Sequence, residues 1–80
     1  MPVPVSFYQY LSDKALDLVR NSQTMTYTDL VRDVASQFGP SYEYAHGGAL
    51  AQAVKTARDY WEDQGDSLRS EAMRRAFVKS

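Results

Sequence analysis

The residues with the greatest potential for chemistry lie together in the stretch Tyr42 to Val54, which reads YEYAHGGALAQAV. This stretch holds the only histidine of the chain, His46, close to the carboxylate of Glu43 and followed by a Gly-Gly pair. An imidazole near a carboxylate is a common arrangement in acid–base catalysis, and both groups also bind transition metals. The stretch is therefore the first candidate for an enzyme site or a metal site.

Neither kind of site is supported by the other residues of the chain. A metal site needs three or four ligands, and His46 with one nearby carboxylate supplies too few in a chain without cysteine. Nucleophilic catalysis needs a serine held against the histidine and an acid that orients it, and no spacing in the sequence suggests this arrangement. So small a domain also rarely encloses a dry pocket. We expect no enzyme activity, metal, cofactor or small-molecule substrate.

Length and composition describe one folded domain. The chain has 80 residues, of which 44% are hydrophobic and 24% charged, so residues 1–80 are expected to form a single domain with a small core. The sequence has no basic leader, no cysteine and no apolar run approaching the roughly 18 residues that span a membrane. We expect a cytoplasmic protein without membrane contact.

Charge is distributed unevenly along the chain. The net charge of -1 gives no overall attraction to the phosphates of nucleic acids. Up to Asp66 there are five basic and nine acidic residues, whereas beyond it Glu71 is the only acid among four basic residues. A mildly basic C-terminal segment thus follows an acidic body.

The first part of the sequence predicts an extended arm and a helix. The two prolines within residues 1–5 disfavour helix in the residues before them, so an extended N-terminal arm is expected there. Apolar residues then recur at intervals of three and four over 7–20, which is typical of an amphipathic helix. Ser6 and Gln9 have the spacing of a capping box at its start.

Three further helical segments follow. Thr26 and Asp29 form a second capping pattern, and the helix that they begin is expected to end at the pair Gly39-Pro40. A third helix, ended by Gly65, and a fourth segment with its own apolar stripe complete the series. Their expected ranges are Tyr44 or Gly47 to Gln64, and 66–80. The predicted fold is an all-α compact bundle of three to four short helices.

The segment from Met25 to Val54 resembles the helix-turn-helix part of winged-helix domains, including that of alkyltransferase-like DNA repair proteins. The residues that carry the resemblance are Thr26, Tyr27, Leu30, Ala45, Gly47, Gly48, Ala49 and Leu50. The Pro-Cys-His-Arg motif of the alkyltransferases has no counterpart here, so their chemistry does not carry over. The resemblance implies a helix-turn-helix-like pair and binding to nucleic acid.

Binding to nucleic acid requires cations for the phosphates and a few side chains for base edges. The candidates are Gln52, Lys55 and Arg58 on the third helix, helped by Arg69, Arg74 and Arg75. Acidic residues crowd the C-terminal end of the same helix, from Asp59 to Asp66. The competing interpretation is that these charges only solvate the faces of a helical bundle.

Tyrosine is abundant for so small a core, with six in the chain. Its large ring and polar tip suit protein–protein contact, although several tyrosines can simply cover a shallow core. We expect Tyr42 and Tyr44, with His46 beside them, to form a contact surface. The pair Gly47-Gly48 then lets the third helix approach the second closely, or admits the backbone of a partner.

Two functions follow, both without catalysis. One is a small regulator that binds nucleic acid through the helix-turn-helix-like pair. The alternative is a protein-binding inhibitor or adaptor, of the phage or mobile-element type, that blocks a single larger host partner. The resemblance favours the first, while the acidic balance and the tyrosines favour the second.

Overall fold

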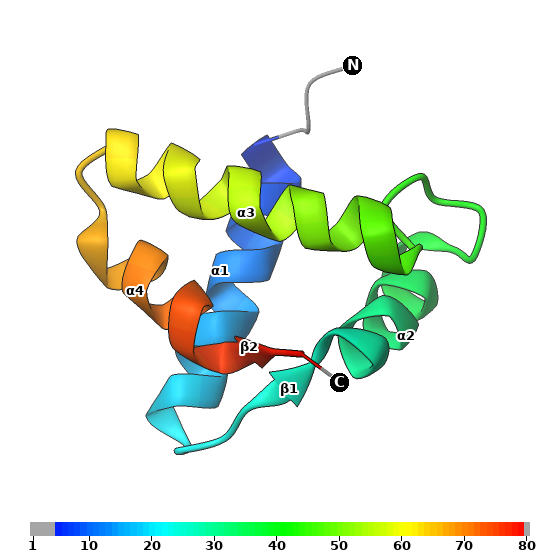
Figure 1. The fold of residues 1–80 in the computed structure, drawn as a ribbon, viewed down its shortest axis with the longest axis horizontal. Coiled ribbons are helices and arrows are strands. Elements are labelled where there is room, and N and C mark those ends of the chain that lie inside the picture. Colours follow the sequence, from blue (N-terminus) through cyan, green and yellow to red (C-terminus); the bar gives the residue numbers. More distant parts are fainter. Residues whose placement is uncertain (1–4, 80) are drawn as a thin grey trace.

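Four helices and two very short strands make up the computed structural model, which describes residues 5–79 (Figure 1). The all-α prediction is confirmed, since helices form nearly all of the regular structure. In chain order the elements are α1 (Val5–Arg20), β1 (Met25–Thr26), α2 (Tyr27–Phe38), α3 (Gly47–Asp63), α4 (Ser67–Ala76) and β2 (Phe77–Val78).

Local sequence signals explain where α2 and α4 begin. The Thr26 hydroxyl accepts a hydrogen bond from the backbone N–H of Asp29 at 3.2 Å, as its spacing predicted. The carboxylate of Asp66 accepts in the same way from the N–H of Arg69 at 3.1 Å. Gly39 and Gly65 follow the ends of α2 and α3 with φ values of 100° and 77°, a backbone conformation that favours glycine.

The two ends of the described chain differ from the expectation. The extended arm was predicted to reach residue 5, but Val5 already belongs to α1, and the rest of that arm lies outside the described residues. Ser6 therefore lies inside the first turn rather than before it. At the other end, the fourth helical segment was predicted to continue to residue 80, but α4 ends at Ala76 and the chain becomes extended at Phe77.

The extended C-terminal segment forms a parallel pair with the strand before α2. Met25 pairs with Phe77, and Thr26 pairs with Val78. The Phe77 side chain is buried in the core, so its burial stabilises the extended conformation that the pairing needs. As a result, β2 lies beside the start of α2 (Figure 1).

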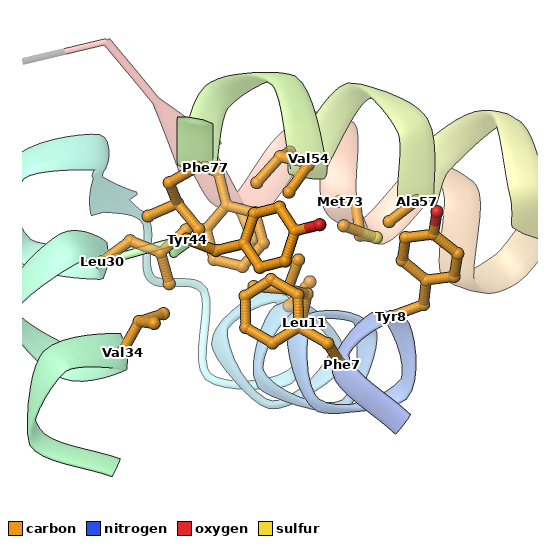
Figure 2. Close-up of a cluster of buried hydrophobic side chains, with 14 of the residues drawn as sticks. Phe7, Tyr8, Leu11, Leu30, Val34, Tyr44, Val54, Ala57, Met73 and Phe77 are labelled. Carbon is orange, nitrogen blue, oxygen red and sulfur yellow. The ribbon is translucent and has the colours of Figure 1, made fainter. Parts of the chain in front are cut away.

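The core lies where α1, α3 and α4 meet, and α2 closes one side (Figures 1 and 2). Leu11, Leu30 and Leu50 are completely buried, and Met73 of α4 is only 1% exposed. The described part of the C-terminal segment, 66–79, is thus part of the body. It packs on α1 and α3 through a stripe of small and apolar residues, namely Ala72, Met73 and Ala76.

The connection between α2 and α3 is a loop over 39–46, longer than the turn of three or four residues in a helix-turn-helix motif. α4 and β2 follow α3 where a winged helix would continue with a hairpin. Within residues 5–79 the strands are β1 and β2 alone. The arrangement is a helical bundle in which the two-residue strands β1 and β2 pair in parallel.

Candidate functional site

The exposed side of α3 divides into two chemically different halves. Helical spacing places Gly48, Gln52 and Lys55 along the side opposite the core, and all three are exposed. The same line continues toward the C-terminus through Asp59 and Glu62. We call these exposed residues the α3 surface: its first half is neutral to basic, and its second half is acidic.

Two of the predicted cations are not used in ion pairs within the described part of the chain. Lys55 is exposed and makes no ion pair with another described residue. Arg58 is half-buried on the flank of α3, and its Nε is buried without a hydrogen-bond partner among residues 5–79. Lys55 therefore has hydrogen-bonding capacity left for a ligand.

Arg74 and Arg75 form weak pairs at the surface. Arg74 lies 3.9 Å from Glu62 of α3, with both side chains more than half exposed. Arg75 lies 3.3 Å from Glu71 one turn earlier on α4, and both are again largely exposed. Exposed pairs of this kind contribute between about 0 and 1 kcal/mol, so either arginine can leave its partner at little cost.

Arg69 differs from the other predicted contact residues because it joins α4 to α1. Its Nη1 donates to Asp13 and to the fully buried hydroxyl of Ser12, both at 2.6 Å. Its Nε lies 3.1 Å from Asp66, and its guanidinium lies 5.1 Å from the Trp61 ring centre. These interactions hold Arg69 within the fold, so it is not available as a free cation.

A shallow concavity of about 350 Å³ lies between the start of α2 and the start of α3. It is lined by Tyr27, Thr28, Val31, Arg32 and Gly47. The Arg32 side chain is 80% exposed and lies 3.9 Å from Asp29, so it is held only weakly. Sequence reasoning did not select Tyr27 or Arg32 as contact residues. The sequence did hold a signal for Arg32, since this residue lies on the polar side of a well-delimited amphipathic helix.

The Gly47-Gly48 pair opens α3 but does not serve close packing inside the chain. A Cβ atom added at either glycine would meet nothing within 4 Å. The expectation that the pair lets α3 approach α2 closely is therefore wrong, because both positions face open space. The adjoining His46 is exposed and makes no side-chain capping bond to α3. Among residues 5–79, no group of three or more potential ligands is placed to hold a metal ion.

Aromatic side chains gather at the other end of α2. Phe38 is 41% exposed and stacks on Tyr42 with ring centres 4.9 Å apart. Tyr10 of α1 meets Phe38 edge to face at 5.1 Å, and the buried Phe7 lies beneath both Phe38 and Tyr42 at 5.5 Å. We call the surface formed by Tyr10, Phe38 and Tyr42 the aromatic face.

Tyr44 belongs to the core rather than to a contact surface. Its side chain is 9% exposed, and its ring stacks on Phe7 at 5.3 Å, where Figure 2 shows it among the buried side chains. Burial raises the pKa of the Tyr44 phenol, and the Glu43 carboxylate raises it further. Tyr42, which is half-buried, remains as the predicted tyrosine that reaches the surface.

A polar network borders the aromatic face where α1 meets α2. The Tyr10 hydroxyl donates to the Asp33 carboxylate, which also lies 3.1 Å from the Lys14 ammonium. Burial first, and then this hydrogen bond and the carboxylate charge, raise the pKa of Tyr10. Two of the charges that border the face, Asp33 and Lys14, are therefore already paired with each other.

No family model, curated protein or solved structure matches the chain in the comparisons with known proteins. The likeness to winged-helix domains thus continues to rest on the residues between Met25 and Val54. Within the described part of the chain, none of the helices combines the length and the apolar character needed to cross a membrane.

Proposed function

We propose that the chain is a small non-catalytic regulator that binds duplex nucleic acid through the first half of the α3 surface. The observation that carries the proposal is the exposed Gln52 and Lys55 on the N-terminal half of this long helix, beside a concavity with the exposed Arg32. In helix-turn-helix proteins, residues near the start of the recognition helix contact the base edges. Gln52 has the donor and acceptor groups for such a contact.

The cations around α3 supply the phosphate contacts in this proposal. Lys55 and Arg58 make no ion pair with another described residue, and Arg32 and Arg75 are held only by exposed pairs at 3.9 and 3.3 Å. Phosphate groups compete well with such pairs because the contact releases counterions from the nucleic acid. Arg69 contributes to the fold instead, since its partners are Ser12, Asp13 and Asp66.

The acidic half of the α3 surface gives the complex an orientation. Asp59 and Glu62 repel phosphates, so the C-terminal end of α3 must point away from the duplex. The small residues Gly47, Gly48 and Ala51 leave room for a sugar–phosphate backbone at the N-terminal end. The proposed docking therefore has the start of α3 in the groove and its end in solvent.

Binding to a labelled duplex at low and at ordinary salt tests the proposal. The wild-type chain is expected to bind at low salt and to weaken steeply as salt rises. The double variant Lys55→Gln/Arg58→Gln is expected to bind at least about tenfold more weakly, because two phosphate contacts are lost. The matched control is Arg20→Gln, which removes an exposed cation at the end of α1 and is expected to bind like the wild type. Absence of binding at low salt contradicts the proposal.

A second candidate is the protein-binding inhibitor or adaptor, which the exposed ring of Phe38 stacked on Tyr42 favours. On this hypothesis, affinity capture from a host lysate returns one stoichiometric protein, and Tyr42→Ala abolishes the capture without unfolding the chain. Capture that survives this substitution places the interface elsewhere.

A further inference from the structure

An exposed lysine directly follows the strand β2. This residue, Lys79, makes no ion pair with another residue in the described range 5–79. Its ammonium group carries three hydrogen-bond donors, and none of them is taken up by a carboxylate of the described chain. Lys79 therefore resembles Lys55 in having its charge free for an anionic ligand.

The register of the parallel pair indicates where Lys79 lies. Thr26 of β1 pairs with Val78 of β2, and the two strands run in the same direction. Beyond this last pair, one strand continues into Tyr27 and the other into Lys79. Both residues leave the pair at the same end, where Figure 1 shows β2 directed toward the start of α2. Lys79 thus lies beside the first turn of α2.

The backbone that carries Lys79 is anchored in the core. Phe77, two residues earlier, is 4% exposed, and Figure 2 shows its ring among the buried side chains. Ala76 before it is completely buried. Because the anchor and the strand pairing already fix the backbone, a ligand at Lys79 has only the side chain left to order, which lowers the entropic cost of the contact.

The start of α2 is also where the concavity beside α3 lies. Tyr27 lines the concavity together with Arg32, whose side chain is 80% exposed. The acid in the first turn of α2 is Asp29, and it lies 3.9 Å from Arg32. This acid therefore already has a cation of its own, and Lys79 adds positive charge to the region from a second element.

We propose that Lys79 is a further phosphate contact of the duplex, at the Tyr27 side of the concavity. The inference rests on the proposed function, in which the start of α3 lies in the groove. A sugar–phosphate backbone that leaves the groove on the α2 side passes the concavity and then meets the lysine that follows β2. An ammonium group on a flexible stem suits this role, because it binds phosphate as a point charge without a fixed orientation.

The salt dependence of binding to a labelled duplex, measured by fluorescence anisotropy with the full chain, tests the proposal. Lys79→Gln is expected to bind about threefold more weakly at moderate salt and to reduce the slope of log affinity against log salt by about 0.9. Lys79→Arg keeps the charge and is expected to bind like the wild type. Arg20→Gln is the matched control, since it removes an exposed cation at the end of α1 and is expected to leave the slope unchanged.

A further variant separates the position of the charge from the net charge of the chain. Lys79→Gln/Asn21→Lys keeps the net charge but moves the cation to the exposed position after α1. It is expected to bind as weakly as Lys79→Gln, with the same reduced slope. Circular dichroism checks that each variant is folded.

Three outcomes overturn the proposal. They are an unchanged slope in Lys79→Gln, loss of binding in Lys79→Arg, and wild-type affinity in the variant with the moved charge. If the wild type binds with a slope that depends on Lys55 but not on Lys79, the proposed function stands and this inference alone fails. A wild type that does not bind at low salt overturns both.

Discussion

The aromatic face and the α3 surface lie on the same small domain but differ in chemistry. The aromatic face exposes apolar rings and carries no charge, so it gains free energy when it is covered. The first half of the α3 surface carries the exposed Lys55, which makes no ion pair with another described residue, so this half gains little from burial and, on the proposed function, more from a polyanion. The difference shows that a domain of this size can carry two surfaces of opposite chemistry on one core.

The first prediction tests how far the buried Phe7 supports the aromatic face. Phe7 is buried under Tyr10, Phe38 and Tyr42, so Phe7→Ala is expected to lower the free energy of unfolding by about 3 to 5 kcal/mol. Phe38→Ala is the matched variant, because it removes the same ring from a position that is 41% exposed. It is expected to cost no more than about half as much. Urea denaturation followed by circular dichroism measures both, and equal losses would show that Phe38 is a core residue.

The second prediction compares Arg69, which is held within the fold, with Arg75, which is exposed. Arg69→Met is expected to lower the free energy of unfolding by about 2 to 3 kcal/mol, because the charged hydrogen bonds from Arg69 that link α4 to α1 are lost and the buried Ser12 hydroxyl keeps only its own bond to the Gln9 carbonyl. Arg75→Met removes only an exposed pair with Glu71 and is expected to cost less than about 0.5 kcal/mol. In duplex binding, measured under conditions where both variants are fully folded, Arg75→Met is expected to lose more affinity than Arg69→Met. A larger loss of binding in Arg69→Met than in Arg75→Met would show that Arg69 is part of the contact surface.

The third prediction concerns the pH dependence of stability that the buried and half-buried tyrosines cause. Burial raises the pKa values of Tyr8, Tyr10, Tyr42 and Tyr44 in the folded chain. The fold therefore favours the neutral phenols, and their stabilisation is complete below the unfolded pKa of about 10 and is lost as the pH rises above it. The midpoint of urea denaturation is expected to fall above pH ~10, and less steeply in Tyr10→Phe. A midpoint that stays constant through this range contradicts the burial of these phenols.

The fourth prediction has the smallest effect and tests the start of α3. Gly48→Ala adds a Cβ atom that meets nothing within 4 Å in a helical segment, so it is expected to stabilise the chain by about 0.5 to 1 kcal/mol. If nucleic-acid backbone approaches this turn, the same substitution weakens duplex binding. Stabilisation without any loss of binding would show that the glycine pair is not part of the contact.

The helices could be predicted from the sequence because their signals are local. The Thr26 cap, the stop after Phe38 and the start of α4 at Ser67 all depend on residues within four positions of each other. The parallel pair of β1 with β2 could not be predicted in this way. Two-residue strands have no visible alternation, and the pairing of Met25 with Phe77 depends on how α4 packs on the body.

The candidate sites were predictable only where exposure follows from helical spacing. Gln52 and Lys55 are exposed, as their positions on α3 indicated. Tyr44 was expected at the surface but is buried, because the loop over 39–46 folds back onto Phe7 of α1. Arg69 was expected to be free, but its partners Ser12 and Asp13 are distant in sequence and meet it only in the folded chain.

The salt dependence of duplex binding tests the central proposal most directly. The slope of the logarithm of affinity against the logarithm of salt concentration is measured for the wild type, for Lys55→Gln and for the control Arg20→Gln. If Lys55 contacts a phosphate, its replacement is expected to reduce the slope by about 0.9, while the control leaves it unchanged. Equal slopes for the wild type and Lys55→Gln would contradict binding through the first half of the α3 surface.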